Sequence, residues 1–383
     1  MDTKKNFTHQ FVNSGTIPVA RRASLWQYLT AAGILILVLA ILTITAVIAY
    51  ALLPAKVHYH IKKTFQVSQD TDAANIYLGI MLPKSGPYQT VHNVSIQWDG
   101  GQDTQSRAYV DLLKLSSHLP GKSQATAVVE YDVTLRQGKT AWQAPVEQVT
   151  LLPEQGIESN HELIRQTADQ ITSEVNGNQA FKIFQFTANF LEYSETGCDE
   201  TNVSALEAFN TRAGACIGYS RLMVALSRAA GIPARMVIGT ILPDILFSLP
   251  QVNTTGIPGS GHAWVEYNAQ NRWHLADPSC GRGYTSYLSF DRSDGQHLSF
   301  GDFNQFIDSK DELYDWATQY ASAQEIQLTS VFASGSDQTE IRSETTIRKI
   351  WDFRWINTIL ALVAVAFLLT KISDRVVKRY PPN

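Results

Sequence analysis

The longest uncharged stretch of the chain constrains its fold more than any other feature. Residues 23–55 carry no charged side chain across 33 positions and contain the run GILILVLAILTITAVIAYALL. About 20 apolar residues in a helix are enough to cross the hydrocarbon core of a bilayer. The alternative is a cleaved signal peptide, but its apolar core would be only about 7–15 residues long. The sequence therefore predicts a retained transmembrane helix over 23–55.

A second uncharged stretch, Trp355 to Thr370, lies near the C-terminus. It corresponds to about 24 Å of helical rise, which is short for a membrane span, and the alternative is a helix buried in a soluble core. Aromatic residues gather at its start and basic residues follow it, as is typical of membrane–water interfaces (Trp351, Phe353 and Trp355; Lys371, Arg375, Lys378 and Arg379). We predict a second transmembrane helix over 351–371.

Charge is distributed unevenly along the 383 residues. The chain has 31 basic and 35 acidic residues, a net charge of −4, which argues against a nucleic-acid-binding surface. The ends, 1–55 and 351–383, each carry +3, so the segment 56–350 carries −10. Because Lys and Arg near membrane helices favour the cytoplasmic side, we predict a two-pass protein of the inner membrane with cytoplasmic tails 1–22 and 372–383 and a periplasmic centre. Three basic residues after the first helix weigh against this orientation (Lys56, Lys62 and Lys63).

The first part of the centre, 56–152, has the pattern of a sheet domain. Runs such as VHYHIKKTFQV and ATAVVEYDVTL are rich in Val, Ile, Tyr and Thr, and Gly- and Pro-containing turns separate them. This pattern predicts a small β-sandwich. His58, His60 and His92 could bind a metal ion, but exposed strand histidines are the simpler interpretation.

From residue 153 the pattern becomes mixed. Apolar residues recur at helical spacing in SNHELIRQTADQIT, NQAFKIFQFTANFLEYS and CIGYSRLMVALSRAAG, with a further short helix over Val203–Phe209. Strand-like runs follow in RMVIGTIL, HAWVEYNAQ and RWHLADPSCG. We predict an α+β fold with a mixed domain over 153–332, and a polar stalk over 333–350 that leads to the second transmembrane helix.

Three short pieces of the mixed domain carry side chains suited to nucleophilic catalysis. Cys216 stands between a Gly-containing turn and the first turn of a buried helix, where the helix dipole and free N–H groups lower a thiol's pKa. A thiolate there would be a nucleophile, whereas the alternative is a small buried apolar side chain. His262 opens a strand after a Gly-rich loop, and Asp277 ends a strand before Pro278.

A hairpin of strands 262–268 and 272–277 would place His262 and Asp277 opposite each other. A Cys–His–Asp relay then has its thiol, its base and its orienting carboxylate. His274 is a rival base, but strand alternation places it off the face of Asp277.

Two stretches resemble the transglutaminase-like superfamily of papain-fold cysteine enzymes: GACIGYSRLMVALSRAAGIPARMVIGT and GHAWVEYNAQNRWHLADPS. The resemblance covers roughly residues 160–300. It implies a catalytic domain over 153–332 with Cys216 as nucleophile, His262 as base and Asp277 as orienting carboxylate. GQHLSFGDF also resembles the strand that follows the aspartate in that family, but it lacks the Arg expected before Asp302.

The resemblance implies a membrane-anchored enzyme that acts on amide bonds of a protein or peptide substrate through a thioester. Hydrolysis, deamidation and cross-linking all remain open, and the alternative is a non-catalytic binding module on the same fold. We expect no cofactor or metal, because no loop has calcium-binding spacing and no Cys–His cluster has zinc spacing. The oligomeric state stays unknown.

Two further expectations concern the surroundings of the site. The segment 243–261 is rich in Pro and Gly and ends beside His262, which is typical of a loop that controls access to an active site. Cys198 and Cys280 flank the catalytic pieces in sequence, so they are candidates for a disulfide that would leave Cys216 as a free thiol.

Overall fold

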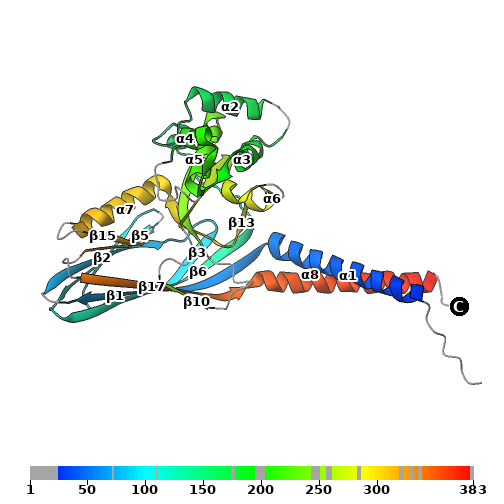
Figure 1. Cartoon of the computed structure of the whole chain (residues 1–383), viewed down its shortest axis with the longest axis horizontal. Helices are drawn as coiled ribbons and strands as arrows, with labels where there is room; N and C mark the ends of the chain where they lie inside the picture. The colour runs from blue at the N-terminus through cyan, green and yellow to red at the C-terminus, as the bar shows by residue number, and fades with distance from the viewer. Residues whose placement is uncertain are drawn as a thin grey trace, which may run out of the picture.

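The computed structural model describes residues 25–379, apart from 71–72, 109, 174–176, 195–202, 243–250, 256–260, 283–285, 319–322, 328–330 and 335–338. It has three parts: a pair of long helices, a β-sandwich, and a helix-and-strand unit seated on the sandwich (Figure 1). The predicted α+β class, with a sheet domain and apolar helices near both termini, is confirmed.

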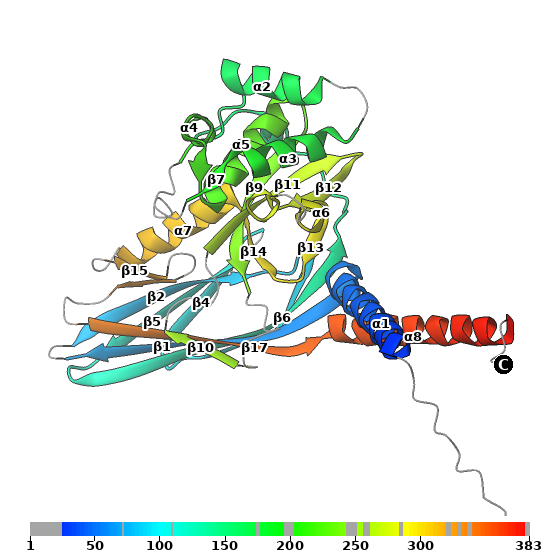
Figure 2. The same ribbon diagram turned by 45° about the vertical axis from the view of Figure 1, so that its right-hand side comes forward.

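The two long helices, α1 (Leu25–Leu52) and α8 (Phe353–Arg379), lie side by side (Figures 1 and 2). Each is long and apolar enough to cross a membrane. Their apolar side chains stay exposed in the chain itself: Ile36 is 67% exposed and Leu360 is 62% exposed. Burial within this chain therefore does not explain their composition.

The helices are joined to the sandwich through a pair of neighbouring strands. α1 leads into β1 (Ala55–Gln69), and β17 (Thr339–Asp352) leads into α8. The two strands pair antiparallel, with Val57 opposite Asp352. The guanidinium of Arg354 donates to the Asp352 carboxylate over 2.7 Å and lies over the ring of Tyr50. Both helices therefore leave the same end of the sandwich.

Two sheets face each other in the sandwich. One has the order β10–β17–β1–β6–β13, with β3 also paired to β6, and the other has the order β15–β16–β2–β5–β4. Val, Ile, Leu and Tyr side chains of β1, β2, β5 and β6 alternate inward and share one buried core, as a two-sheet packing requires. The remaining bounds are β2 (Ala74–Pro83), β3 (Gln89–Gln97), β4 (Gly101–Ser106), β5 (Val110–Leu119), β6 (Ser123–Lys139), β10 (Gln251–Thr255), β13 (Arg292–Asp294), β15 (Ala323–Gln327) and β16 (Val331–Ser334).

The predicted stalk over 333–350 is wrong, and so is the boundary at 332. β15 and β16 extend the sheet of β2, and β17 pairs with β1 along its length, with Ile347 buried opposite Ile61. The polar run TEIRSETTIRKIWD resembles a linker because only one face of this strand is buried. The chain therefore returns to the sandwich after the helix-and-strand unit, which is an insertion between sandwich strands.

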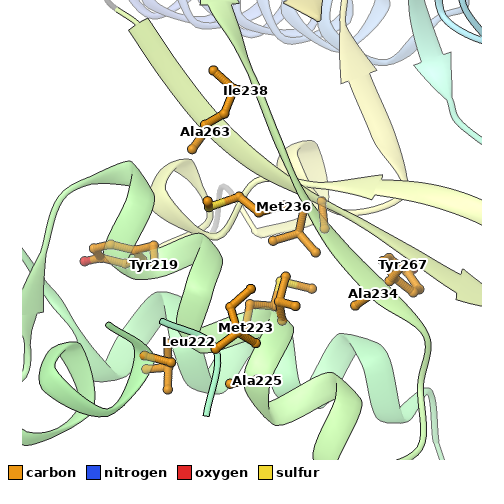
Figure 3. Packing of buried hydrophobic residues seen from close by; sticks show 14 of the residues in the cluster. Tyr219, Leu222, Met223, Ala225, Ala234, Met236, Ile238, Ala263 and Tyr267 are labelled. Atoms are coloured by element: carbon orange, nitrogen blue, oxygen red, sulfur yellow. The ribbon is translucent and has the colours of Figure 1, made fainter. Parts of the chain in front are cut away.

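The inserted unit is built on a third sheet of order β12–β11–β9–β14. Its strands are β9 (Ala234–Ile241), β11 (Gly261–Ala269), β12 (Arg272–Ala276) and β14 (His297–Asp302). The buried helix α5 (Cys216–Ala229) packs on this sheet, and Figure 3 shows Met223 of the helix below Met236 of β9 in the same buried cluster. The predicted helices are confirmed as α2 (Glu162–Thr172), α3 (Gln179–Phe190), α4 (Ala205–Thr211) and α5.

Short elements complete the unit and connect it to the sandwich. α7 (Phe303–Thr318) crosses from β14 to the sheet of β2. The others are η1 (Gln148–Leu151), β7 (Glu192–Tyr193), β8 (Ala213–Gly214), η2 (Pro278–Cys280) and α6 (Ser286–Ser289).

Three expectations made outside the catalytic pieces meet different outcomes. His60 Nδ1 lies 2.9 Å from Asp132 Oδ1 and His58 Nδ1 lies 2.8 Å from Thr134 Oγ1, so side chains of the same sheet already engage these rings. Within 243–261, Gln251–Thr255 form β10, which joins β17, and Gly261 begins β11, whereas 243–250 and 256–260 lie outside the described residues. Cys198 also lies outside them, so the proposed disulfide stays a prediction.

Candidate active site

Cys216 is the first residue of α5 and is partly buried. The preceding residue, Ala215, has an extended backbone and gives the helix no side-chain cap. The first N–H groups of a helix have no intrahelical partner. The thiol therefore sits where free N–H groups and the positive end of a buried helix favour an anion.

His262 lies on β11, opposite Gly239 of β9. This glycine permits a close approach: a Cβ atom there would lie 2.1 Å from the Leu298 carbonyl oxygen and 2.4 Å from the Trp264 ring. Trp264 is fully buried, and the His262 ring stacks beside it with centroids 6.1 Å apart and an interplanar angle of 24°. Strand pairing and this indole therefore hold the imidazole in place.

Asp277 follows β12 and caps η2, where Pro278 occupies the first helical position. One carboxylate oxygen, Oδ1, accepts from the backbone N–H and the hydroxyl of Ser279 over 3.0 and 2.7 Å. The other, Oδ2, lies 2.8 Å from His262 Nε2. The carboxylate is 1% exposed, and its Oδ2 faces the imidazole.

The predicted register of the hairpin is wrong by a small shift. Ala269 pairs with Arg272 across a two-residue turn, so Asp277 lies beyond the paired end of β12 and reaches back to His262. The turn residues Gln270 and Asn271 both have positive φ, 54° and 59°, as the tight hairpin turn that suits strand twist requires. The rival base His274 pairs with Tyr267, stacks on its ring and lies 3.3 Å from Asp291, away from the His262–Asp277 pair.

The site favours a charged imidazole. Burial lowers the pKa of His262, but the charge of Asp277 and side-chain hydrogen bonds with Asp277 and Cys216 outweigh it, so the pKa rises to about 9. Burial raises the pKa of Asp277, but His262 and His297 more than reverse this and hold it well below its usual range. His262 thus interacts with the thiol of Cys216 on one side and an ionised carboxylate on the other. Base-assisted thiol chemistry needs this arrangement.

Sequence reasoning missed His297, at the start of β14. Its Nε2 lies 3.3 Å from Asp277 Oδ2, and its Nδ1 lies 2.9 Å from Asp294 Oδ1. The only sequence signal is the GQHLSFGDF run, where a histidine opens a strand that follows Asp277 in the chain.

Cys280 also lies beside the site. Ligand atoms of His262, Asp277 and Cys280 are all within 4.8 Å of one another, which is compatible with a soft metal ion. Both oxygens of Asp277 already accept hydrogen bonds, however. Burial and the nearby Asp277 charge raise the pKa of the Cys280 thiol, so at neutral pH it is protonated.

Residues 164–278 match the family model described as the Transglutaminase-like superfamily. The matched segment contains Cys216, His262 and Asp277, so this part of the chain is a transglutaminase-like domain.

The solved structures that match the chain share little sequence identity with it. A candidate cysteine protease from Cytophaga hutchinsonii is 13% identical, with 78% of this chain and 93% of that one covered and a TM-score of 0.48. The periplasmic domain of TgpA from Pseudomonas aeruginosa, in a form bound to ethylmercury, is 18% identical, with 65% and 97% covered and a TM-score of 0.29. A candidate protease from Parabacteroides distasonis is 13% identical, with 55% and 42% covered and a TM-score of 0.26. No curated protein matches the sequence.

Proposed function

We propose that this protein is a membrane-anchored cysteine enzyme that acts on amide bonds of proteins or peptides. The observation that carries the proposal is the position of His262. Its ring contacts Cys216 at the start of a buried helix and, through Nε2, the buried Asp277 carboxylate 2.8 Å away. The match of residues 164–278 to the transglutaminase-like family supports the same reaction type.

In the proposed reaction the Cys216 thiolate attacks the amide carbonyl carbon and forms a tetrahedral oxyanion. Free N–H groups at the start of α5 would stabilise that charge. The His262 imidazolium then gives its proton to the departing amine, which leaves a thioester on Cys216. Neutral His262 next takes a proton from the acceptor that cleaves the thioester, water or an amine, while Asp277 orients the ring.

We further propose that α1 and α8 both cross the inner membrane and carry the enzyme on its periplasmic side. Their exposed apolar side chains and their exit from one end of the sandwich support two spans with both tails on one face. The basic tails support a cytoplasmic position for that face.

The test is to trap the thioester. Wild-type protein mixed with a periplasmic extract at a series of pH values and quenched in acid should carry substrate acyl groups on Cys216, whereas a His262→Ala variant, which lacks the acid that expels the amine, should carry none. Mass spectrometry of the Cys216 peptide measures the adduct, and Cys216→Ala is the control. Recovery of unmodified Cys216 from the wild type at all pH values, together with failure of the wild type to react with a thiol-directed acylating probe, would overturn the proposal.

A further inference from the structure

The aspartate of the site has a second histidine partner that the proposed reaction does not use. His297 is 5% exposed, and its two ring nitrogens lie within hydrogen-bonding distance of two different carboxylates, Asp277 and Asp294. A neutral imidazole has one N–H donor, so it can donate to only one of them. Both contacts are satisfied at once only by the doubly protonated, positively charged ring.

The surrounding groups favour that charged form. Burial lowers the pKa of His297, but the charge of Asp294 and hydrogen bonds with Asp277 and Asp294 raise it to about 10. Asp294 is 40% exposed at its side chain, yet Gln296 N donates to its Oδ1 over 2.8 Å, which favours the ionised carboxylate. The His262 ring on β11 also faces His297, and the Cys280 thiol in η2 lies near the two carboxylates, Asp277 and Asp294.

The ring is also held in one orientation. It meets Trp264 edge-on, with centroids 4.9 Å apart and an interplanar angle of 86°, and it lies 5.5 Å from the His262 ring. The same oxygen of Asp277, Oδ2, serves both histidines. Any change at His297 therefore acts on the oxygen that orients the proposed base.

We propose that His297 is a positioning residue. As a permanent cation between Asp294 and Asp277, it fixes the orientation of the Asp277 carboxylate and weakens the attraction of that carboxylate for the His262 imidazolium. This rests on the proposed function. The imidazolium of His297 offsets one of the two negative charges of Asp277 and Asp294, so His262 faces only part of the negative charge of Asp277. Without that cation, Asp277 would hold the His262 imidazolium more tightly, and proton transfer to the leaving amine would be slower.

The experiment follows the His262 titration by NMR of ring-labelled histidines in the full chain in detergent, together with the pH dependence of Cys216 alkylation by iodoacetamide. The variants are His297→Gln, which keeps an N–H donor but loses the charge, and Asp294→Asn, which keeps His297 but removes its anchor. His274→Gln is the matched control. That histidine lies in the same sheet and also faces a carboxylate, Asp291, but it is outside the site.

In His297→Gln we expect the titration of His262 to move to higher pH. The high-pH transition in the rate of Cys216 alkylation should move with it. We expect Asp294→Asn to match the wild type below the pH at which its His297 titrates and to resemble His297→Gln above it. Turnover in His297→Gln should fall on the order of 10- to 100-fold, the range known for hydrogen-bond partners of metal-binding histidines, with KM little changed.

An unshifted His262 titration in a folded His297→Gln protein would overturn the positioning role. If His297→Gln does not fold, the same conclusion follows from an Asp294→Asn protein whose His262 titration equals that of the wild type at every pH. Failure of the proposed function is distinct, because Cys216 of the wild type would then alkylate like an ordinary thiol whatever stands at position 297.

Discussion

At the scale of single residues, the site depends on a buried carboxylate shared by two imidazoles. Asp277 receives hydrogen bonds at both oxygens, and two of its partners are ring nitrogens of His262 and His297. A buried charge is tolerated only when such partners compensate it. The electrostatic balance of these three residues therefore decides both the protonation of the proposed base and the stability of this part of the fold.

The first prediction concerns the proposed nucleophile. Cys216→Ala should reduce amide-bond turnover to background while the melting temperature stays close to that of the wild type, because the thiol is small and partly buried. His262→Ala should lose about as much turnover, and Asp277→Asn less, since the members of a triad act as a unit and the orienting group often costs least. Turnover assays and thermal unfolding on the same preparations measure both effects. Full activity of Cys216→Ala would refute the proposal that the protein is a cysteine enzyme.

The second prediction is a pH dependence of stability. His262 and His297 have pKa values raised to about 9 and about 10, so their stabilising effect is complete below the unfolded-state pKa near 6.5 and declines as pH rises through these values. Asp277 has a lowered pKa, so its effect is complete above about pH 4 and is lost in stronger acid. The difference in unfolding free energy between wild type and His262→Gln should thus be largest near pH 5–6 and shrink towards pH 10. A difference that stays constant across this range would contradict the assignment.

At the scale of elements, the third sheet positions the site through close packing. β9 lies between β11 and β14, and Gly239 lets the Trp264 ring pack against that strand. α5 packs on β9 and β11, and its Leu222 and Met223 belong to the buried core of the inserted unit. The helix start and the strand that carries His262 are therefore parts of one packed body.

The third prediction tests this packing. Gly239→Ala would place a Cβ atom 2.4 Å from the Trp264 ring and closer still to the Leu298 carbonyl. We expect a loss of roughly 1–3 kcal/mol in unfolding free energy and a displaced His262, seen as slower alkylation of Cys216. Gly86→Ala is the control, since its nearest neighbour would be Gln89 Cγ at 3.8 Å. Equal stability of the two variants would show that β9 yields to the added methyl group.

At the scale of the whole molecule, the sandwich connects the long apolar helices α1 and α8 to the inserted unit. β1 and β17, which continue α1 and α8, are neighbours in one sheet. The inserted unit reaches that sheet through β13 and β10, and α7 packs on the other sheet. The sandwich therefore fixes where the candidate site stands relative to the two helices.

The fourth prediction concerns the contribution of β17 to the sandwich. A chain of residues 54–352, without the helices, should unfold cooperatively, whereas one of residues 54–338 should not, because β1 and β10 then lose their pairing with β17. Limited proteolysis and thermal unfolding distinguish the two. A stable 54–338 fragment would mean that β17 is dispensable.

The fifth prediction concerns topology. A reporter active only in the periplasm should work when fused after Lys56 and fail when fused after Asn383. Activity of the C-terminal fusion alone would reverse the orientation, and activity of both would mean a single span.

The sequence alone determined the local features, because helix periodicity, a helix start and a strand end depend on residues that are close together in the chain. It was enough to predict the apolar helices, the helices from α2 to α5, and the three residues that the fold brings together. The role of β17 was decided by tertiary structure, because a strand with one buried face is recognised only beside its partner β1. His297 likewise gains its importance from Asp277, 20 residues earlier in the chain, through a contact that exists only once β14 is placed against β9.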